Sequence, residues 1–236
     1  MGQAERGSAV AGEFSRSWSS MLDAPGWWPG ASQIECTRLM RGAGSSADAI
    51  LSEDFVTALG SSLRKWRAFR GARFDSERLR ASLEALAPLL RRWEGVSILT
   101  LRPEDMEDLF ELFDAVREIK PTTRKWVVAS KLLYHVLPNL IVPMDNQLTA
   151  PFLGRGSLPA TFEASFLVES CSAFVGLARD RSHGIGALRV RAASREVPYP
   201  VEGAALMDCR VGLARVLDLA IAGFVREHGR TALRTL

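Results

Sequence analysis

The chain has 236 residues, 47% of them hydrophobic, and a formal net charge of +3 with a pI near 9.0. These values are ordinary for a globular protein and predict one compact domain. The charge is too small to identify a nucleic-acid-binding protein by itself, so the distribution of the charged residues carries more information.

Several function classes are excluded by what the chain lacks. It has no apolar run of about 18 residues, the length of a transmembrane helix, and no charged-then-apolar signal at its N-terminus. We therefore expect no membrane partner and a cytoplasmic location. Its three cysteines are far apart and odd in number, which favours free thiols over disulfides. Its three histidines are isolated from one another, so their spacing indicates no set of metal ligands. We predict no metal and no cofactor.

The first 46 residues are predicted to form a loose N-terminal arm with one short helix. Residues 1–30 are rich in Gly, Ser and Ala and show no helical periodicity. A second loose stretch, residues 42–46, separates the short helix from a helical domain that we assign to residues 47–236.

The first part of that domain contains three predicted helices. Ser52 is suited to be the N-cap of the first helix. Asp75 or Ser76 begins the second, which Pro88 should kink or divide. Pro103 suits the first turn of the third, whose acidic residues should face solvent or a basic helix edge.

The centre of the chain, residues 128–149, combines a helix, a proline stop, an apolar crossing and an isolated acid. The helix should start at Thr122 or Thr123 and end near Leu137, because Pro138 cannot continue it. We predict that one face of this helix is an apolar stripe.

A second face of the same helix is mostly cationic, with Arg124, Val128, Lys131 and His135 at helical spacing. After the proline, an apolar run leads to Asp145, where a short helix, Asn146 to Leu153, should begin. The chain thus returns an acid towards a basic helix edge, and Asp145, Lys131 and His135 are the candidate catalytic residues. Each has a structural alternative: an N-cap for Asp145, a salt bridge for Lys131 and a helix C-terminal imidazole for His135.

Two further helices are predicted after the central segment. Residues 159–180 and 203–228 both carry apolar side chains at helical spacing. Residues 187–200 fit a strand or a short helix equally well. With one uncertain strand in the whole chain, the predicted fold class is all-α, a single compact multi-helix domain.

The central segment contains the pattern S-K-x-L-x-H-x-L-P-x-L-x-x-P-x-D at Ser130, Lys131, Leu133, His135, Leu137, Pro138, Leu140, Pro143 and Asp145. In this pattern it resembles a set of uncharacterised all-helical bacterial and archaeal proteins. The upstream stretch Leu63 to Leu83 is similar to theirs as well. This resemblance implies an all-helical fold and carries no known activity.

Residues 142–145 read VPMD and match a V-P-x-D segment that follows a hairpin helix and an apolar crossing. Here the chain resembles, more distantly, the helix-hairpin-helix DNA glycosylases. The Asp of that segment is catalytic in the family, so the resemblance implies a catalytic Asp145. The family's hairpin turn contains glycine, whereas residues 120–125 read KPTTRK. The family's nucleophilic lysine would fall nearest Lys125 or Trp126, so the resemblance does not assign that role to a residue.

Basic residues favour DNA as the partner. The candidate DNA-binding residues are Arg64, Lys65, Arg67, Arg70, Arg124 and Lys125. Tyr134 or Trp126 could stack on a base.

We predict DNA binding with base-excision glycosylase-like activity, by a lyase or hydrolase reaction, and leave open at this point whether the protein is an enzyme. The alternative is a non-catalytic protein-interaction or structural domain. An unrelated hydrolase has no motif in its favour.

Overall fold

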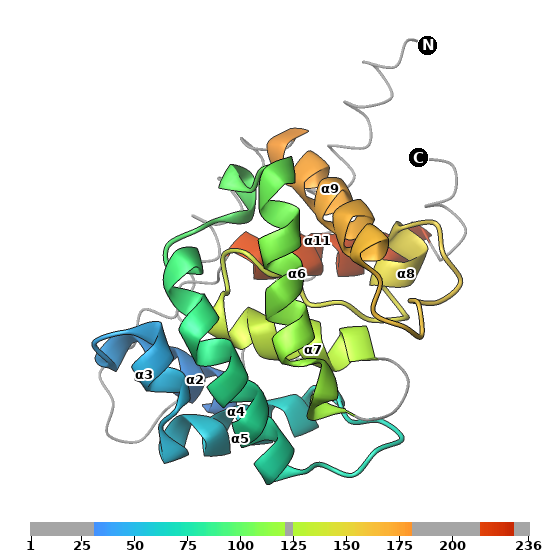
Figure 1. The fold of residues 1–236 in the computed structure, drawn as a ribbon. Coiled ribbons are helices and arrows are strands. Elements are labelled where there is room, and N and C mark those ends of the chain that lie inside the picture. The colour runs from blue at the N-terminus through green and yellow to red at the C-terminus, as the bar shows by residue number, and fades with distance from the viewer. Residues whose placement is uncertain (1–30, 121–124, 181–212, 229–236) are drawn as a thin grey trace, which may run out of the picture.

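The computed structural model describes residues 31–120, 125–180 and 213–228, and all regular structure in these ranges is helical (Figure 1). The predicted all-α class is confirmed for this part of the chain. None of the helices described is both long and apolar enough to cross a membrane.

The α-helices are α2 (Ala31–Gly42), α3 (Ser46–Ile50), α4 (Glu53–Lys65), α5 (Ser76–Leu86), α6 (Met106–Ala115), α7 (Lys125–Val136), α8 (Thr149–Phe152), α9 (Ala164–Asp180) and α11 (Leu213–His228). Short 3-10 helices between them are η2 (Ala87–Trp93), η3 (Ile98–Thr100), η4 (Pro103–Asp105) and η5 (Arg117–Ile119).

Local sequence signals set the starts of α4 and α5. The Ser52 hydroxyl accepts a hydrogen bond from a backbone amide in the first turn of α4, and the Asp75 carboxylate accepts two such bonds in α5. Pro88 lies in η2, where the α-helix has given way to a 3-10 helix. The predicted N-caps and the division at this proline are confirmed.

Helix α7 lies between α2 to α5 on one side and α8, α9 and α11 on the other, with α6 packed against it (Figure 1). All its residues except Lys125, Val127 and Lys131 are buried. The predicted cationic face is therefore wrong for its described members: Val128 and His135 lie in the interior, and only Lys131 keeps partial exposure. A helix with apolar residues on all sides is buried, not two-faced.

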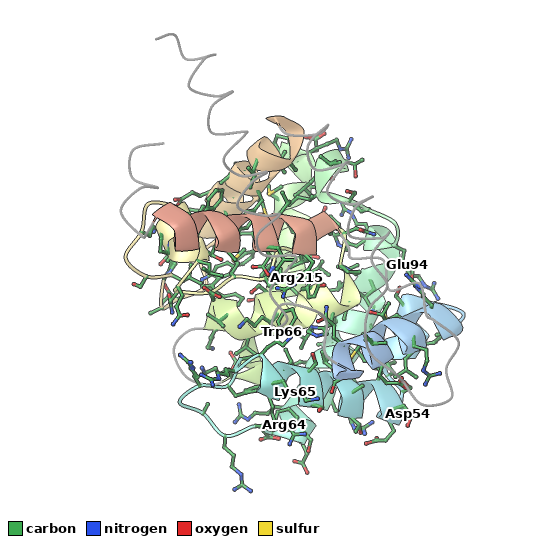
Figure 2. All side chains as sticks on the ribbon, turned by 180° about the vertical axis from the view of Figure 1, so that it is seen from behind. Asp54, Arg64, Lys65, Trp66, Glu94 and Arg215 are labelled. Carbon is green, nitrogen blue, oxygen red and sulfur yellow. The ribbon has the colours of Figure 1, made fainter. Side chains whose placement is uncertain are left out.

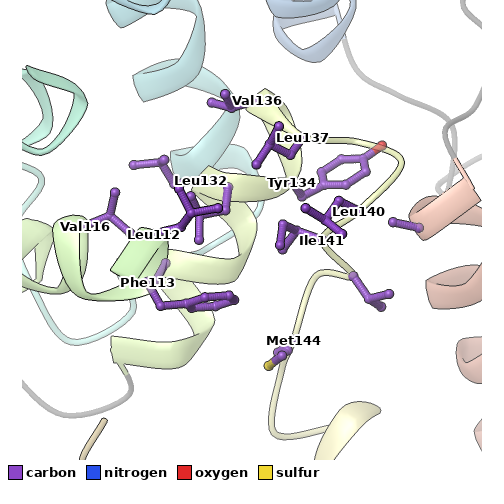
Figure 3. Packing of buried hydrophobic residues seen from close by; sticks show 14 of the residues in the cluster. Leu112, Phe113, Val116, Leu132, Tyr134, Val136, Leu137, Leu140, Ile141 and Met144 are labelled. Carbon is purple, nitrogen blue, oxygen red and sulfur yellow. The ribbon is translucent and has the colours of Figure 1, made fainter. Parts of the chain in front are cut away.

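The core is built around α7 and the apolar crossing that follows it. Figure 3 shows this packing: Leu112, Phe113 and Val116 come from α6 and its C-terminal cap, and the labelled residues of α7 and the crossing are Leu132, Tyr134, Val136, Leu137, Leu140, Ile141 and Met144. Trp126 is fully buried, with its ring stacked on Phe162 at 4.4 Å between centroids. Burial of each large apolar side chain contributes about 1.5 to 3 kcal/mol. This packing fixes α7 and, with it, the position of Lys131.

Some observed boundaries differ from the predicted ones. Helix α9 begins at Ala164 and not at Pro159, and α8 is shorter than predicted because turns precede it. The predicted starts of α7 and α11 and the segment of uncertain class, residues 187–200, lie outside the described residues. Helix ends depend on cap geometry, which periodicity alone does not reveal.

The segment predicted as an N-terminal arm with a short helix contains α2. This helix packs against α4 and α7, and its Cys36 is buried in the core. Residues 1–30 lie outside the described part of the chain, and the domain boundary after residue 46 stays a prediction.

The acidic residues around α6 lie on the solvent side, as one of the two predictions had it. Arg92 forms an ion pair with Asp108, and Arg102 pairs with Asp105 at 3.2 Å. Such surface pairs are screened by water and contribute at most about 1 kcal/mol each. None of them reaches α7, so they leave the charges near Lys131 unaffected.

Candidate functional site

A pocket of about 680 Å³ opens beside the end of α4, the side of α7 and the turns after the apolar crossing. Lys131 and Asp145, two of the three candidate catalytic residues, line it together. Arg67, Arg70 and Lys120 also line it, so its described walls carry four cationic residues and one acid. The volume is typical of small-molecule sites, and the charge favours an anionic ligand.

Asp145 combines a structural role with a free carboxylate oxygen. Its Oδ1 accepts hydrogen bonds from the amides of Gln147 and Leu148, at 2.8 and 2.7 Å. These bonds hold the turn before α8, whose N-cap is Leu148, so Asp145 has a structural role in a turn and not the predicted one as a helix N-cap. Within the described part of the chain Oδ2 has no hydrogen-bond or ion-pair partner. One oxygen therefore holds the turn, and the other is available to the pocket.

The Lys131 ammonium lies at the pocket wall. Its Nζ donates to the Trp66 carbonyl oxygen at 3.0 Å. Burial lowers the pKa of Lys131, and the negative charge of Asp145 opposes that shift. Asp218 also opposes it, while Arg215 adds to it. Lys131 and Asp145 thus affect each other through space without forming a direct ion pair.

His135, the third candidate, is buried and does not line the pocket. Its Nδ1 lies 2.6 Å from the Lys131 carbonyl oxygen, and its Nε2 lies 2.8 Å from Ser62 Oγ. A carbonyl only accepts, so Nδ1 carries the proton and Nε2 accepts from the hydroxyl. Burial lowers the pKa of His135 to about 4, so the ring is neutral near pH 7. This geometry makes His135 a support for α7 beneath Lys131.

Ser130 anchors the crossing that carries Asp145 to the pocket. Its hydroxyl oxygen accepts the Met144 amide at 2.9 Å, and both residues are buried. Leu140 and Val142 of the crossing are buried in the same core. The crossing is therefore fixed to α7 one residue before the acid.

A cluster behind Lys131 was not predicted from the sequence. The Arg215 guanidinium of α11 lies 5.0 Å from the centre of the Trp66 ring, and Figure 2 shows the two side chains close together. Arg215 forms an ion pair with Asp218, and burial raises the pKa of that carboxyl. Tyr134 stacks on Trp66 with 5.5 Å between ring centroids. Trp66 is thus part of a packed wall, held by residues from α7 and α11.

One sequence signal could have identified the α11 pair. Asp218 follows Leu217 in an apolar stretch of α11, and a charge among apolar positions is normally paired. Arg215 stands three residues earlier, at the spacing of a helical ion pair. The sequence does not reveal, however, that α11 lies beside Trp66.

Four of the predicted DNA-binding residues lie at the end of α4 or directly after it. Arg64, Lys65, Arg67 and Arg70 are all exposed, and none forms an ion pair in the described part of the chain. Arg67 and Arg70 line the pocket. Arg64 and Lys65, labelled in Figure 2, are in the last turn of α4 and extend this basic surface beyond the pocket lining.

The other two predicted DNA-binding residues are less informative. Lys125 pairs with Glu118 at 3.0 Å, which reduces the charge that it offers to a ligand. Arg124 lies outside the described residues. The basic surface that the structure describes is therefore centred on the end of α4.

Neither aromatic residue predicted to stack on a base is accessible. Trp126 is fully buried, and Tyr134 is 4% exposed with its hydroxyl accepting a hydrogen bond from Gln33. That interpretation is wrong, because both rings belong to the core around α7. The aromatic side chain on the pocket wall is Trp66.

The described residues offer little support for thiol or metal chemistry. Cys36 and Cys171 are buried free thiols, and burial raises the pKa of each to about 12. No group of three or more His, Cys, Asp or Glu in the described ranges is placed to hold a metal ion.

Comparison of the chain with protein-family models, with curated proteins and with solved structures finds no match. No family is therefore assigned on that basis. The chemistry of the pocket follows from its own residues, of which Asp145 and Lys131 have the groups suited to a reaction.

Proposed function

We propose that this protein binds DNA and acts on the sugar of a nucleotide held in the pocket, in the manner of a base-excision glycosylase. The observation that carries the proposal is that Asp145 and Lys131 line one pocket whose other charged wall residues are all cationic. DNA is a polyanion, and its contacts with such a surface are mainly electrostatic. A pocket of about 680 Å³ can accept a nucleotide turned out of the duplex.

Asp145 supplies the carboxylate in this proposal. Its Oδ2 can take a proton from a water that attacks the anomeric carbon, or stabilise the positive charge that develops on the sugar. The bond to the base breaks, and the base leaves with the electron pair and takes up a proton. In the hydrolase reaction Lys131 stays an ammonium. In the lyase alternative its neutral form, which burial favours by lowering the pKa of Lys131, would attack the same carbon in place of water and give up a proton.

We also propose that the helices form one compact domain, distantly related to the helix-hairpin-helix glycosylases. One hydrophobic cluster with members in α2, α4 to α7, α9 and α11 supports the single domain. The order of α7, apolar crossing and Asp145 supports the relationship. The turn that would correspond to the hairpin, residues 121–124, lies outside the described part of the chain.

Base release from duplexes that contain deaminated, oxidised or alkylated bases tests the activity. The wild type should release a base from at least one duplex, and Asp145→Asn should bind that duplex but release no base. A wild type that is inactive on every duplex would contradict the proposed chemistry. Full activity of Asp145→Asn would show that the Asp145 carboxylate takes no part in it.

A second candidate function is a non-catalytic interaction domain, in which Lys131, His135 and Asp145 only stabilise the fold through internal polar contacts. It is favoured by the internal hydrogen bonds of Asp145 Oδ1 and of both His135 ring nitrogens. Salt separates the two functions. DNA binding that falls steeply with added salt supports the first, and no binding at low salt supports the second.

A further inference from the structure

The residue after the C-terminal cap of α4 has an unusual backbone conformation. Arg67 has a φ of 51°, the one positive φ among the described non-glycine residues. The amides of Arg67 and Ala68 donate to the carbonyls of Arg64 and Leu63, at 2.9 and 3.0 Å, which is a Schellman motif. Glycine usually occupies this position, because a Cβ in the left-handed region crowds the following carbonyl.

The turn around Arg67 lines the pocket and is held at both ends by lysines. Lys131 donates to the Trp66 carbonyl at 3.0 Å, and Lys120 donates to the Arg70 carbonyl at 2.9 Å. A glycine would form the same turn with less strain. What the strained residue adds is therefore its side chain, at the edge of a pocket.

The cationic groups around this turn have spare hydrogen-bond donors. Neither Arg67 nor Arg70 has a partner for its guanidinium group in the described part of the chain, and both are exposed. The charge of Arg70 is close enough to lower the pKa of Lys131, after the larger effects of burial, of the carboxylates of Asp145 and Asp218, and of Arg215. The Lys131 ammonium uses one of its three N–H donors on the protein. Three cations with unused donors thus surround one pocket.

We propose that Arg67, Arg70 and Lys131 bind a phosphate group of the pocket's ligand. Guanidinium groups donate in pairs to phosphate oxygens, and an ammonium adds a point charge. The assignment rests on the proposed function for the identity of that ligand as a nucleotide. It accounts for an arginine at a position that favours glycine.

Titration of the full chain with inorganic phosphate at constant ionic strength, followed by calorimetry, tests this site. The wild type should bind phosphate saturably. Arg67→Gln and Arg70→Gln should each bind at least about tenfold more weakly, because charge-assisted hydrogen bonds are lost. Arg91→Gln is the matched control, because Arg91 is exposed on η2 and does not line the pocket. Absence of saturable binding by the wild type, or wild-type affinity in Arg67→Gln, would overturn the assignment.

Arg67→Gly separates the backbone from the side chain. It should lose phosphate binding as Arg67→Gln does, but melt about 2 to 4 °C higher than that variant, because the left-handed strain is removed. Arg67→Gln keeps the strained backbone and should melt like the wild type. Equal melting temperatures of the two variants would overturn the view that the arginine is kept at a cost in stability.

Two competitors distinguish the sources of phosphate. Equal competition by methyl phosphate and dimethyl phosphate assigns the site to a phosphodiester within a DNA strand, and competition by methyl phosphate alone assigns it to a terminal phosphate. Competition by neither would contradict a phosphate site. None of these outcomes requires base release, so a protein that binds phosphate and releases no base retains this site and loses the proposed chemistry.

Discussion

The Nδ1 atom of His135 lies 2.6 Å from the carbonyl oxygen of Lys131, one turn earlier in α7. This bond connects a residue sealed in the interior to a residue that lines the pocket. Ser62 of α4 completes it by donating to Nε2. In the neutral ring the proton is on Nδ1 and Nε2 accepts from Ser62. A second proton would reverse the Ser62 bond and place a charge in the interior, so it should disturb the packing beneath Lys131.

Acid should therefore destabilise the protein through His135. Its pKa is about 4 in the folded protein and near 6.5 in an exposed chain, so between these values the unfolded chain binds the proton that the folded chain does not. The contribution of His135 is complete above pH 6.5 and is lost as the pH falls through 4. The total loss is on the order of 3 kcal/mol, measured as the free energy of urea unfolding against pH.

The variant His135→Gln removes this titration and should flatten the pH dependence between 6.5 and 4. The chain's other histidines, His183 and His228, provide matched control variants. An unchanged pH dependence in His135→Gln would show that the acid sensitivity has another origin.

Substitutions of Asp145 should separate its two carboxylate oxygens. Asn keeps an oxygen for the amides of Gln147 and Leu148, so Asp145→Asn should melt close to the wild type. Asp145→Ala loses both hydrogen bonds of the turn and should be less stable by about 0.5 to 2 kcal/mol. A loss of 3 to 5 kcal/mol in Asp145→Asn, roughly the cost of stranding a buried charge, would instead indicate an essential pairing with Lys131.

Ser130→Ala should destabilise the protein and displace Asp145. It leaves the buried Met144 amide without an acceptor, which costs about 1 to 3 kcal/mol. Ser170→Ala is the control, because Ser170 is equally buried but only donates to the Phe166 carbonyl within its own helix. Thermal melting of both variants should show the larger effect in Ser130→Ala. Equal effects would mean that the crossing does not depend on this bond.

The basic surface at the end of α4 should set the salt dependence of DNA binding. Removing phosphate contacts lowers the slope of log K against log salt by roughly 0.9 for each contact. The double variant Arg64→Gln, Lys65→Gln should weaken binding uniformly across sequences and flatten this slope, measured by fluorescence anisotropy. Arg91→Gln should leave it unchanged. An unaltered slope in the double variant would show that DNA binds at a different surface of the protein.

Much of the scaffold was predictable because its signals are local. Ser52 and Asp75 cap helices through their own side chains, and Pro88 ends one by lacking an amide hydrogen. The shared location of Lys131 and Asp145 also followed from a local path, since a proline stop and a short crossing connect them.

What the sequence could not reveal depends on packing between distant segments. The spacing of His135 with Lys131 indicated one cationic face, but α6, α4 and α2 enclose the helix and bury the imidazole. The contact of Arg215 with Trp66 joins α11 to the end of α4, and no local pattern encodes it. The left-handed backbone of Arg67 is equally hidden, because an arginine predicts neither that conformation nor a helix end.

The buried members of the S-K-x-L-x-H pattern affect how other chains that carry it should be interpreted. Ser130 and His135 are occupied by internal hydrogen bonds, so a chain could retain them for folding alone and have no chemistry. The pattern is accordingly a marker of architecture. A search for chains with the proposed function should also require the equivalents of Arg67 and Arg70, which the motif does not include and whose side chains lie outside the described core.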